Sequence, residues 1–521
     1  MHCCTFRFRL LVGLFCMVLL VFFEPSHARA GLGSESRFGI DYVFPLDERY
    51  QQAPIAEQLA RTGAGWVNFA LVGWNQVEPT SPQAGQHQYE WDELDAAVRH
   101  WQAHGFHLVF TLRMGKGWFS GPHSYAPEGL PLVARALMEN ADRLPKPEHL
   151  EDYASWVAAV VERYDHDGVG DMPGLVSGVH HYQIGNEAGN PAFWTGSIDD
   201  YFQLLALARN AAQEADPEVK IIPSGLRPND FFIENPQGDD PEPFLQDYLN
   251  RLDPGYREGI LRSLELDRRI LAATGEYDIL DAAGNGSWHQ GAQGFFNWVR
   301  REMEAAGNTA VVWDLESRTE PLLTAVQTTH AYPELEIPRA ADILFQMKGP
   351  RRMRHAQAVE WYRAEQARLL IKVFVARFAG GAEKVFVGMP MDWDQGLEAL
   401  AWPNPFMGLL SSDGSPWPAV HAMTFLVAEL DGFSSAEQVP TEGDIRLYRF
   451  TFSDGRSSLW VAWLHEFEPR GMGDQYPRVE VALPHVASAS QIWTISNTGV
   501  AVEAFSHSTQ YNPLRVTLTP T

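Results

Sequence analysis

The chain contains few cysteines, and all of them lie at its beginning. Only three of the 521 residues are cysteine, namely Cys3, Cys4 and Cys16. These positions fall inside an N-terminal export segment, so we expect the mature chain to contain no disulfide and no thiol nucleophile. Cysteine-based catalysis is therefore excluded from the functions that the mature chain would have.

The sequence also lacks the motifs of three common enzyme classes. It has no Gly-rich phosphate loop, no His-Glu-x-x-His and no Gly-x-Ser-x-Gly, so nucleotide, zinc-peptidase and serine-hydrolase chemistry have no sequence support. His180 and His181 are adjacent and would point to opposite faces of a strand, which makes them a poor pair of ligands for one metal ion. We interpret them as structural histidines and expect neither a metal nor a cofactor.

Basic residues are scarce relative to acidic ones. There are 40 lysines and arginines against 66 aspartates and glutamates, which gives a formal net charge of −26. This excess opposes binding to nucleic acid or to anionic membranes and favours a soluble protein that acts on neutral ligands. The charge identifies no substrate, because a solvated acidic surface accounts for most of it.

Long apolar runs are also missing. The run 10–23 has 14 residues, whereas a helix needs about 20 to span a bilayer. Two arginines precede this run, and Ala28-Arg29-Ala30 gives a small-x-small cleavage pattern before Gly31. The pattern predicts a signal peptide over 1–30 and a secreted or periplasmic protein with no membrane association after cleavage. An uncleaved anchor is the alternative.

From Phe38 onward, short apolar runs alternate with amphipathic helical stretches, which is the pattern of repeated βα units. The expected strands are 38–43, 65–71, 106–112, 179–184, 219–223, 277–282, 309–315 and 384–389. The expected helices include stretches around 91–101, around 201–212 with Ser197 as the N-cap, and over 356–378. Eight such units predict an α/β fold, a (β/α)8 TIM barrel over 31–432. A doubly wound sheet, the alternative, would need a Gly-rich loop after its first strand.

The pattern changes after an expected helix over 418–430. Short apolar runs separated by Ser-Asp-Gly and Asn-Thr-Gly turns predict strands over 445–452, 458–464, 478–483, 491–495 and 514–518. These residues predict a small all-β, sandwich-like C-terminal domain over 433–521.

Two expected strands end in a glutamate. Glu187 follows Asn186 at the end of the fourth strand, and Glu316 ends the seventh. The C-terminal ends of barrel strands meet at one mouth, so the two carboxylates can converge on one bond. A separation of roughly 5 Å suits a retaining glycosidase and about 6.5 to 9.5 Å an inverting one. Glu320 competes with Glu316 as the nucleophile.

This arrangement resembles the clan A glycoside hydrolases, in which an Asn-Glu pair ends the fourth strand and a nucleophilic Glu the seventh. The resemblance spans 38–432 and includes the segments 74–79 and 408–416. It implies a retaining mechanism in which Glu187 is the acid/base and Glu316 the nucleophile. It also implies that Asn186 binds the sugar 2-hydroxyl and that Trp393, after the eighth strand, forms the aromatic floor under the sugar.

Further aromatic residues lie in loops expected at the same mouth. They are Trp74, Trp118, Trp194 and Trp288, and they are candidates to line additional sugar subsites together with His289. For each tryptophan, ordinary packing in the core is an equally good interpretation. Two long segments, 115–150 and 229–243, are rich in loop-forming residues and are expected to shape access to the site.

The sequence departs from the clan pattern around the two glutamates. Asn68 stands where an arginine is usual, and Ala283 and Asn285 stand around the usual histidine and tyrosine. Trp288, His289 and Arg113 are candidates to replace these groups.

The sequence leaves two functional hypotheses. One is a secreted retaining β-glycosidase acting on β-linked glycosides, oligosaccharides or polysaccharides. The other is a non-catalytic carbohydrate-binding or scaffold protein on a degenerate barrel. Both have a carbohydrate partner, and neither implies an oligomeric state.

Overall fold

The computed structural model describes residues 36–51, 53–123, 140–186, 193–222, 356–379, 384–393, 406–441 and 445–464, and the strands 479–483, 492–495, 501–505 and 514–518. The expected sixth and seventh strands lie outside these residues. So do seven side chains that the sequence singled out: Glu187, Ala283, Asn285, Trp288, His289, Glu316 and Glu320.

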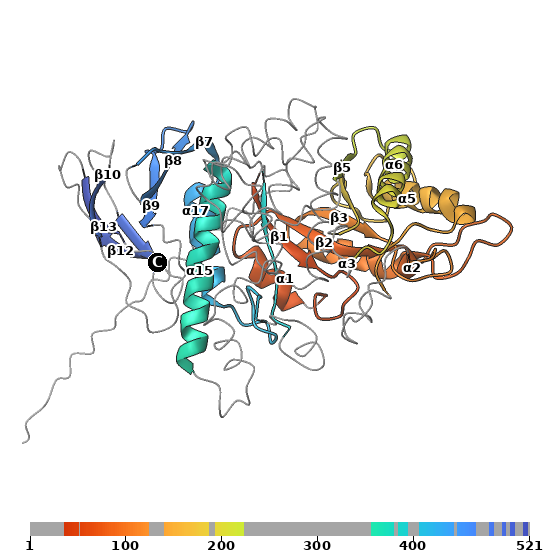
Figure 1. Cartoon of the computed structure of the whole chain (residues 1–521), viewed down its shortest axis with the longest axis horizontal. Coiled ribbons are helices and arrows are strands. Elements are labelled where there is room, and N and C mark those ends of the chain that lie inside the picture. Colours follow the sequence, from red (N-terminus) through yellow and green to blue (C-terminus); the bar gives the residue numbers. More distant parts are fainter. Residues whose placement is uncertain are drawn as a thin grey trace, which may run out of the picture.

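Six described strands form one parallel sheet (Figure 1). They are β1 (Phe38–Val43), β2 (Trp66–Gly73), β3 (His107–Arg113), β4 (His181–Ile184), β5 (Lys220–Ile222) and β6 (Val385–Val387). Their order is β5-β4-β3-β2-β1-β6, so the first strand pairs with the second on one side and with the last on the other. This order is the one in which a barrel closes, and the predicted α/β fold is confirmed.

The sheet is curled, as the packing of its inner side chains shows. Ile222 on β5 and Phe386 on β6 belong to the two outermost strands of the order, yet both join one buried cluster with Val109 of β3. A flat sheet would hold these strands far apart, because neighbouring strands are about 4.8 Å from each other. The opposite faces of the strands, including Phe38 and Phe110, pack in the main core with the helices.

The helices follow the strands in the expected alternation. They are α1 (Ala53–Ala60), α2 (Trp74–Val77), α3 (Asp92–Ala103), the 3-10 turn η1 (Pro147–His149), α5 (Leu150–Tyr164), α6 (Ile198–Ala215), α15 (Ala356–Ala379) and α17 (Pro418–Leu430). Ser197 caps α6 as predicted: its hydroxyl oxygen accepts from the backbone N–H of Asp200, whose carboxylate accepts from the N–H of Ser197. This reciprocal capping satisfies two N–H groups that the first turn leaves unpaired.

The C-terminal strands are antiparallel, as the predicted all-β region requires. The strands β7 (Phe433–Gln438), β8 (Ile445–Phe452) and β9 (Leu459–Leu464) form one sheet. Two pairs follow, β10 (Val479–Leu483) with β13 (Leu514–Leu518), and β11 (Ile492–Ile495) with β12 (Ala501–Phe505). The sequence did not indicate β7 and β12. The division of the chain at 432/433 stays a prediction.

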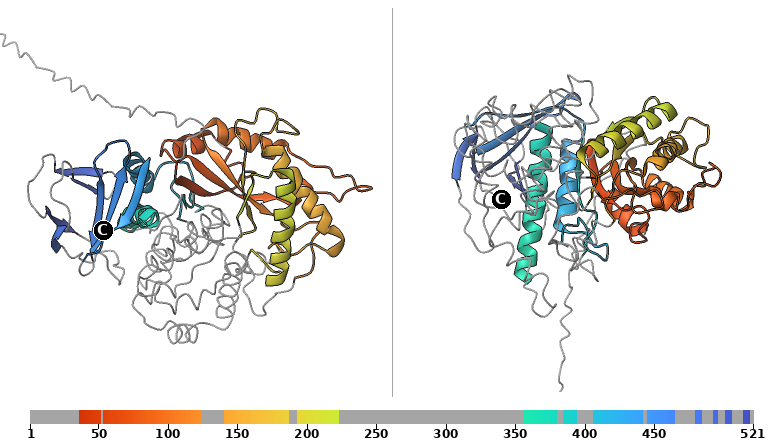
Figure 2. Two further views of the ribbon diagram at one scale, coloured as in Figure 1. Left: turned by 90° about the horizontal axis from the view of Figure 1, so that it is seen from above. Right: turned by 45° about the vertical axis from the view of Figure 1, so that its right-hand side comes forward.

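Helix α15 lies between the two kinds of sheet, with the antiparallel strands on one side and the parallel sheet on the other (Figures 1 and 2). Its Phe378 ring is 5.1 Å from the ring of Phe38 on β1 and 5.2 Å from that of Phe433 on β7. One side chain therefore contributes to both cores.

Within the described ranges, no helix is both long enough and apolar enough to cross a bilayer.

The N-terminal end of the sheet is filled by aromatic rings and imidazoles. The indole of Trp66 lies 4.9 Å from the His107 ring and meets the His181 ring edge-on at 5.5 Å. Burial, and secondarily the positive charges of Lys220 and Lys384, lower the pKa of His181 to about 3. His180 instead bonds to Asp216 through Nδ1 at 2.9 Å. The two histidines therefore lie in separate surroundings and face different ways, as predicted for adjacent residues of a strand.

His181 should make the fold sensitive to acid. Its pKa is about 3 in the folded chain against 6.5 for an ordinary histidine, so the unfolded chain binds a proton that the folded chain excludes between these values. The free energy of unfolding then falls with decreasing pH by up to about 1.4 kcal/mol per unit. We expect His181→Phe to flatten this dependence, as measured by urea unfolding at several pH values. Parallel curves for variant and wild type would contradict the prediction.

Candidate active site

The turn at the end of β4 places Asn186 at the C-terminal edge of the parallel sheet. The backbone N–H of Gly185 donates to the Leu112 carbonyl at 2.9 Å, which continues the hydrogen bonding between β3 and β4. Gly185 then adopts a φ of +74°, a conformation that glycine reaches without steric cost. The hydroxyl of Tyr201 on α6 donates to the carbonyl of Ile184 at 3.0 Å. The chain therefore turns sharply at Gly185, and Asn186 is left 5% exposed.

A hydrogen bond connects Asn186 to β1. Its side-chain Nδ2 donates to the hydroxyl oxygen of Tyr42 at 3.3 Å. Two strands, β2 and β3, separate β1 from β4 in the sheet order, so this bond crosses the concave side of the curled sheet. The motif residue Asn186 thus faces the inside of the barrel mouth, where sequence patterns placed it. Glu187 is the next residue in the chain and lies outside the described residues.

A buried polar chain lies beneath this mouth, on strands β1 to β3. Asn68 Nδ2 donates to the Asp41 carboxylate at 2.8 Å, and the Thr111 hydroxyl donates to Asn68 Oδ1 at 3.0 Å. All three side chains are less than 10% exposed. Both ends of the Asn68 amide therefore bond to buried neighbours.

A buried ion pair lies at the end of β3. Arg113 Nε donates to Asp142 Oδ2 at 2.8 Å, and the other carboxylate oxygen accepts from the backbone N–H groups of Met114 and Gly115 at 3.1 and 2.9 Å. Asp142 is 2% exposed, so these three donors compensate a buried charge. Leu112 pairs with Ile184, which places Arg113 beside the turn that carries Asn186.

Trp393 lies at the same C-terminal edge of the sheet, after β6. Its indole N–H donates to the Tyr50 hydroxyl at 3.0 Å, and its ring is 5.1 Å from that of Phe44. Phe44 in turn lies 6.4 Å from the ring of Tyr42, so an aromatic row connects Trp393 with the partner of Asn186. Trp393 is half-buried, with the Arg49 guanidinium 5.2 Å from its ring. Its contact with a sugar stays a prediction.

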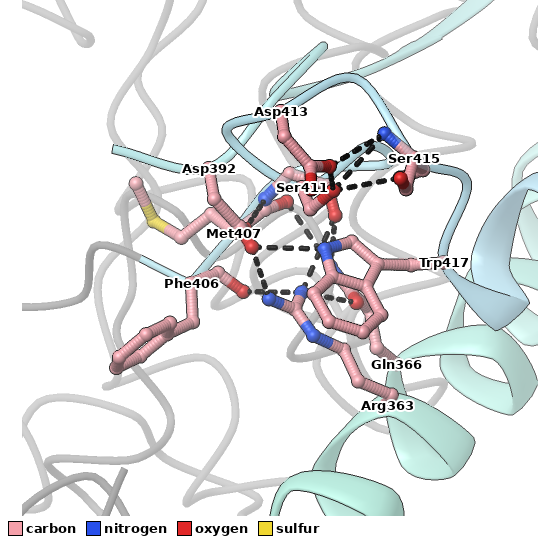
Figure 3. A network of polar contacts seen from close by, with 10 residues as sticks. Arg363, Gln366, Asp392, Phe406, Met407, Ser411, Asp413, Ser415 and Trp417 are labelled. Carbon is pink, nitrogen blue, oxygen red and sulfur yellow. Dashed lines mark hydrogen bonds and ion pairs between the residues drawn. The ribbon is translucent and has the colours of Figure 1, made fainter. Parts of the chain in front are cut away.

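The residue before Trp393 is the centre of a buried network that the sequence did not reveal (Figure 3). The carboxylate of Asp392 accepts from Arg363 at 2.5 Å, from the Trp417 indole at 2.8 Å and from the Gly408 backbone N–H at 2.8 Å. Arg363 comes from α15 and is 2% exposed, as is Asp392. This ion pair therefore fixes the loop that carries Trp393 to a helix of the barrel wall.

The same network holds the segment that precedes α17. Arg363 also donates to the Phe406 carbonyl at 2.8 Å, and Gln366 one helical turn later donates to the Met407 carbonyl at 3.0 Å. Asp392, Arg363 and Gln366 carry no pattern in the sequence that would single them out. The only hint is the position of Asp392 directly before Trp393.

Two of the tryptophans expected at the mouth belong to the core. Trp74 is fully buried, with its ring stacked 3.8 Å from Phe119 and its indole N–H bonded to Glu78 at 2.9 Å. Trp194 is 2% exposed and donates to the Ser197 carbonyl at 3.0 Å. Neither side chain has an exposed face that a sugar could contact, so both tryptophans pack in the core and do not line a sugar subsite. Trp118 is half-buried and donates to the Glu78 carbonyl at 3.1 Å.

One group of carboxylates in the described residues has the spacing of a metal site. Oxygens of Asp165, Asp167 and Asp171 all lie within 4.8 Å of one another, on the loop after α5. Burial, with the charges of Asp167 and other neighbouring carboxylates as a smaller cause, raises the pKa of Asp165 to about 6. This loop precedes β4 and so lies at the end of the sheet opposite to Asn186. Acidic groups of this kind are common without an ion.

No family model matches the chain, and no curated protein matches it. Solved structures do. A family 39 glycoside hydrolase from the gut symbiont Bacteroides cellulosilyticus WH2 has 12% identity and a TM-score of 0.45 over 94% of this chain and 81% of that one. A monomeric beta-xylosidase from Caulobacter crescentus CB15 has 12% identity and a TM-score of 0.45 over 93% of each chain.

A GH5_18 protein from Streptomyces cattleya, in complex with Manβ1-4GlcNAc, has 13% identity and a TM-score of 0.36 over 75% of this chain and 80% of that one. The structures retrieved are clan A glycoside hydrolases. This is the clan that the sequence resembles. At these identities and TM-scores, the similarity does not match individual residues between the chains. The sugars named for those proteins describe those proteins and not this chain.

The buried ion pair beneath Trp393 provides a stability test. Asp392→Ala would leave Arg363 as an uncompensated buried charge, which typically costs about 3 to 5 kcal/mol. The matched control is Asp413→Ala, in the neighbouring loop, where an exposed carboxylate bonds to Ser411 and Ser415. We expect the control to lose at most about 1 kcal/mol. Denaturant unfolding measures both, and equal losses would contradict the assigned role of the ion pair.

Proposed function

We propose that this chain is a retaining β-glycosidase in which Glu187 is the acid/base and Glu316 the nucleophile. The observation that carries the proposal is the hydrogen bond between Asn186 and Tyr42, which crosses the concave side of the sheet. It fixes the residue before Glu187 at the C-terminal mouth, where barrel enzymes hold their catalytic groups. The position of the seventh strand, and hence of Glu316, rests on the sequence pattern.

In the proposed reaction, Glu187 donates a proton to the glycosidic oxygen while a Glu316 oxygen attacks the anomeric carbon. The bond to the leaving group breaks, and a covalent glycosyl-enzyme forms. Glu187, now a carboxylate, then removes a proton from water, whose oxygen attacks the anomeric carbon and releases Glu316. The sugar keeps its anomeric configuration, and the reaction requires only water as a co-substrate.

Asn186 and Trp393 have complementary parts in this proposal. The Asn186 amide would bond to the sugar 2-hydroxyl, and this bond strengthens as positive charge develops on the sugar ring in the transition state. The indole of Trp393 would support the apolar face of the sugar. Arg113 lies at the same edge beside the turn that carries Asn186, where its ion pair with Asp142 would hold the neighbouring loop in place.

A non-catalytic carbohydrate-binding or scaffold protein is the second candidate, and one observation favours it. Both ends of the Asn68 amide bond to Asp41 and Thr111 in the interior. Asn68 therefore cannot supply the charge with which an arginine would orient a nucleophile. A degenerate barrel of this kind would bind saccharides without hydrolysing them.

Substitution of the two glutamates distinguishes these candidates. We expect Glu187→Gln and Glu316→Gln each to reduce hydrolysis of 4-nitrophenyl β-glycosides by at least about a thousandfold. A panel of β-glucoside, β-xyloside, β-galactoside and β-mannoside would be used for the wild type first. Reduced rates with an unchanged melting temperature would assign the loss to chemistry.

Glu320→Gln is the matched control, since it removes a carboxylate from the same segment. We expect it to keep most of the activity, and a 2-fluoro glycoside should label Glu316 covalently, as peptide mass spectrometry would show. Labelling of Glu320 would exchange the two assignments. Saccharide binding by a wild-type protein that hydrolyses no member of the panel would favour the second candidate.

We also propose that the protein is exported. The supporting observation is the N-terminal pattern of basic residues, a 14-residue apolar run and Ala28-Arg29-Ala30. Protein recovered from the medium or periplasm of an expressing bacterium should begin at Gly31 on N-terminal sequencing. Retention of residues 1–30 on membranes would instead identify an anchor.

A further inference from the structure

Tyr42 has a backbone conformation that tyrosine rarely adopts. Its φ is +59°, in the left-handed region that costs free energy for any side chain with a Cβ. The pairing of β1 with β2 shifts register between Ile40 and Val43, so a bulge surrounds the residue. Bulges next to active sites redirect single side chains, and strained residues persist only where their surroundings hold them.

The surroundings of the Tyr42 ring form a fitted pocket. The ring is 6% exposed and packs in a cluster with Ala70, Met389 and Met407. Gly388 lies directly against it: a Cβ at that position would approach the ring to 3.2 Å. The backbone N–H of Tyr42 is also held, because it donates to the carboxylate of Asp41 at 2.7 Å. The strained conformation is therefore held at both the backbone and the ring.

The effect of this conformation is to place the Tyr42 hydroxyl against Asn186. Nδ2 of Asn186 donates to that hydroxyl, and this is the one hydrogen bond of the Asn186 side chain within the described part of the chain. An amide that is bonded through one N–H has a fixed rotation, so its carbonyl oxygen and its second N–H point in set directions. Without this contact, the amide could rotate by half a turn and exchange its donor and acceptor ends.

We infer that Tyr42 is a positioning residue for Asn186, which presents a defined donor and acceptor pair to the hydroxyl at carbon 2 of the sugar. The inference rests on the proposed function and adds to it a determinant of substrate class. The site should favour glycosides with a free 2-hydroxyl over their 2-deoxy analogues, and Tyr42 should be required for much of that preference.

The test compares Tyr42→Phe with the wild type on two substrates. One is the 4-nitrophenyl β-glycoside that the wild type hydrolyses fastest, and the other is its 2-deoxy analogue. Tyr42→Phe keeps the ring and the backbone strain and removes only the hydroxyl. We expect kcat for the 2-hydroxy substrate to fall about tenfold with little change in KM, while the 2-deoxy substrate is hydrolysed at the wild-type rate.

Two further variants make the result specific. Asn186→Ala should abolish the preference for the 2-hydroxyl, and adding Tyr42→Phe to it should cause no further loss, because both changes remove one interaction. The control is Tyr164→Phe, which removes a buried hydroxyl that bonds to Asp95 on the far side of the sheet at 2.8 Å. It should leave the ratio of the two rates unchanged.

The possible failures can be told apart. Equal losses on both substrates would show that Tyr42 supports only the fold, and wild-type rates on both substrates would show that its hydroxyl does not act through Asn186. Either result would overturn the inference and leave the glycosidase proposal intact. A wild-type protein that hydrolyses no glycoside in the panel would overturn both.

Discussion

The curl of the parallel sheet is the constraint on which the other features depend. β1 lies between β2 and β6, and side chains from β3, β5 and β6 meet on the inner face of the curled sheet. Rings and imidazoles occupy its N-terminal end. The Asp41–Asn68–Thr111 chain occupies its middle, where each polar atom needs a partner from a neighbouring strand. The bond from Tyr42 to Asn186 then spans its open end.

Buried ion pairs hold two described segments at this open end of the sheet. Asp142 ties the segment after β3 to Arg113, and Asp392 ties the segment after β6 to Arg363. Asp142 also accepts from two backbone N–H groups, and Asp392 accepts from one backbone N–H and the Trp417 indole. Such pairs add little net stability compared with apolar packing, but they allow few alternative geometries. Precise placement of loops is what a site between strand ends requires.

Local patterns in the sequence predicted many of the described elements but none of the contacts between them. The bounds of β1, β8, β13 and α17 match the expected ranges, and Ser197 caps α6, because periodicity and capping depend on near neighbours. Tyr42 and Asn186 are 144 positions apart, and no pattern in either segment predicts their hydrogen bond. Trp74 was ambiguous for a related reason. The sequence pattern around a tryptophan that follows a strand does not distinguish a ring that faces a ligand from one that packs in the core. The Trp74 ring packs against Phe119.

The position of Phe378 has a consequence for how the molecule can be divided. Its ring touches Phe38 at the start of the parallel sheet and Phe433 at the start of the antiparallel one. Removal of the C-terminal strands would expose the Phe378 ring on α15, and the loss of α15 would uncover both cores. The two sheets are therefore thermodynamically coupled and should melt together in a single calorimetric transition, although their strand patterns suggest two separable modules.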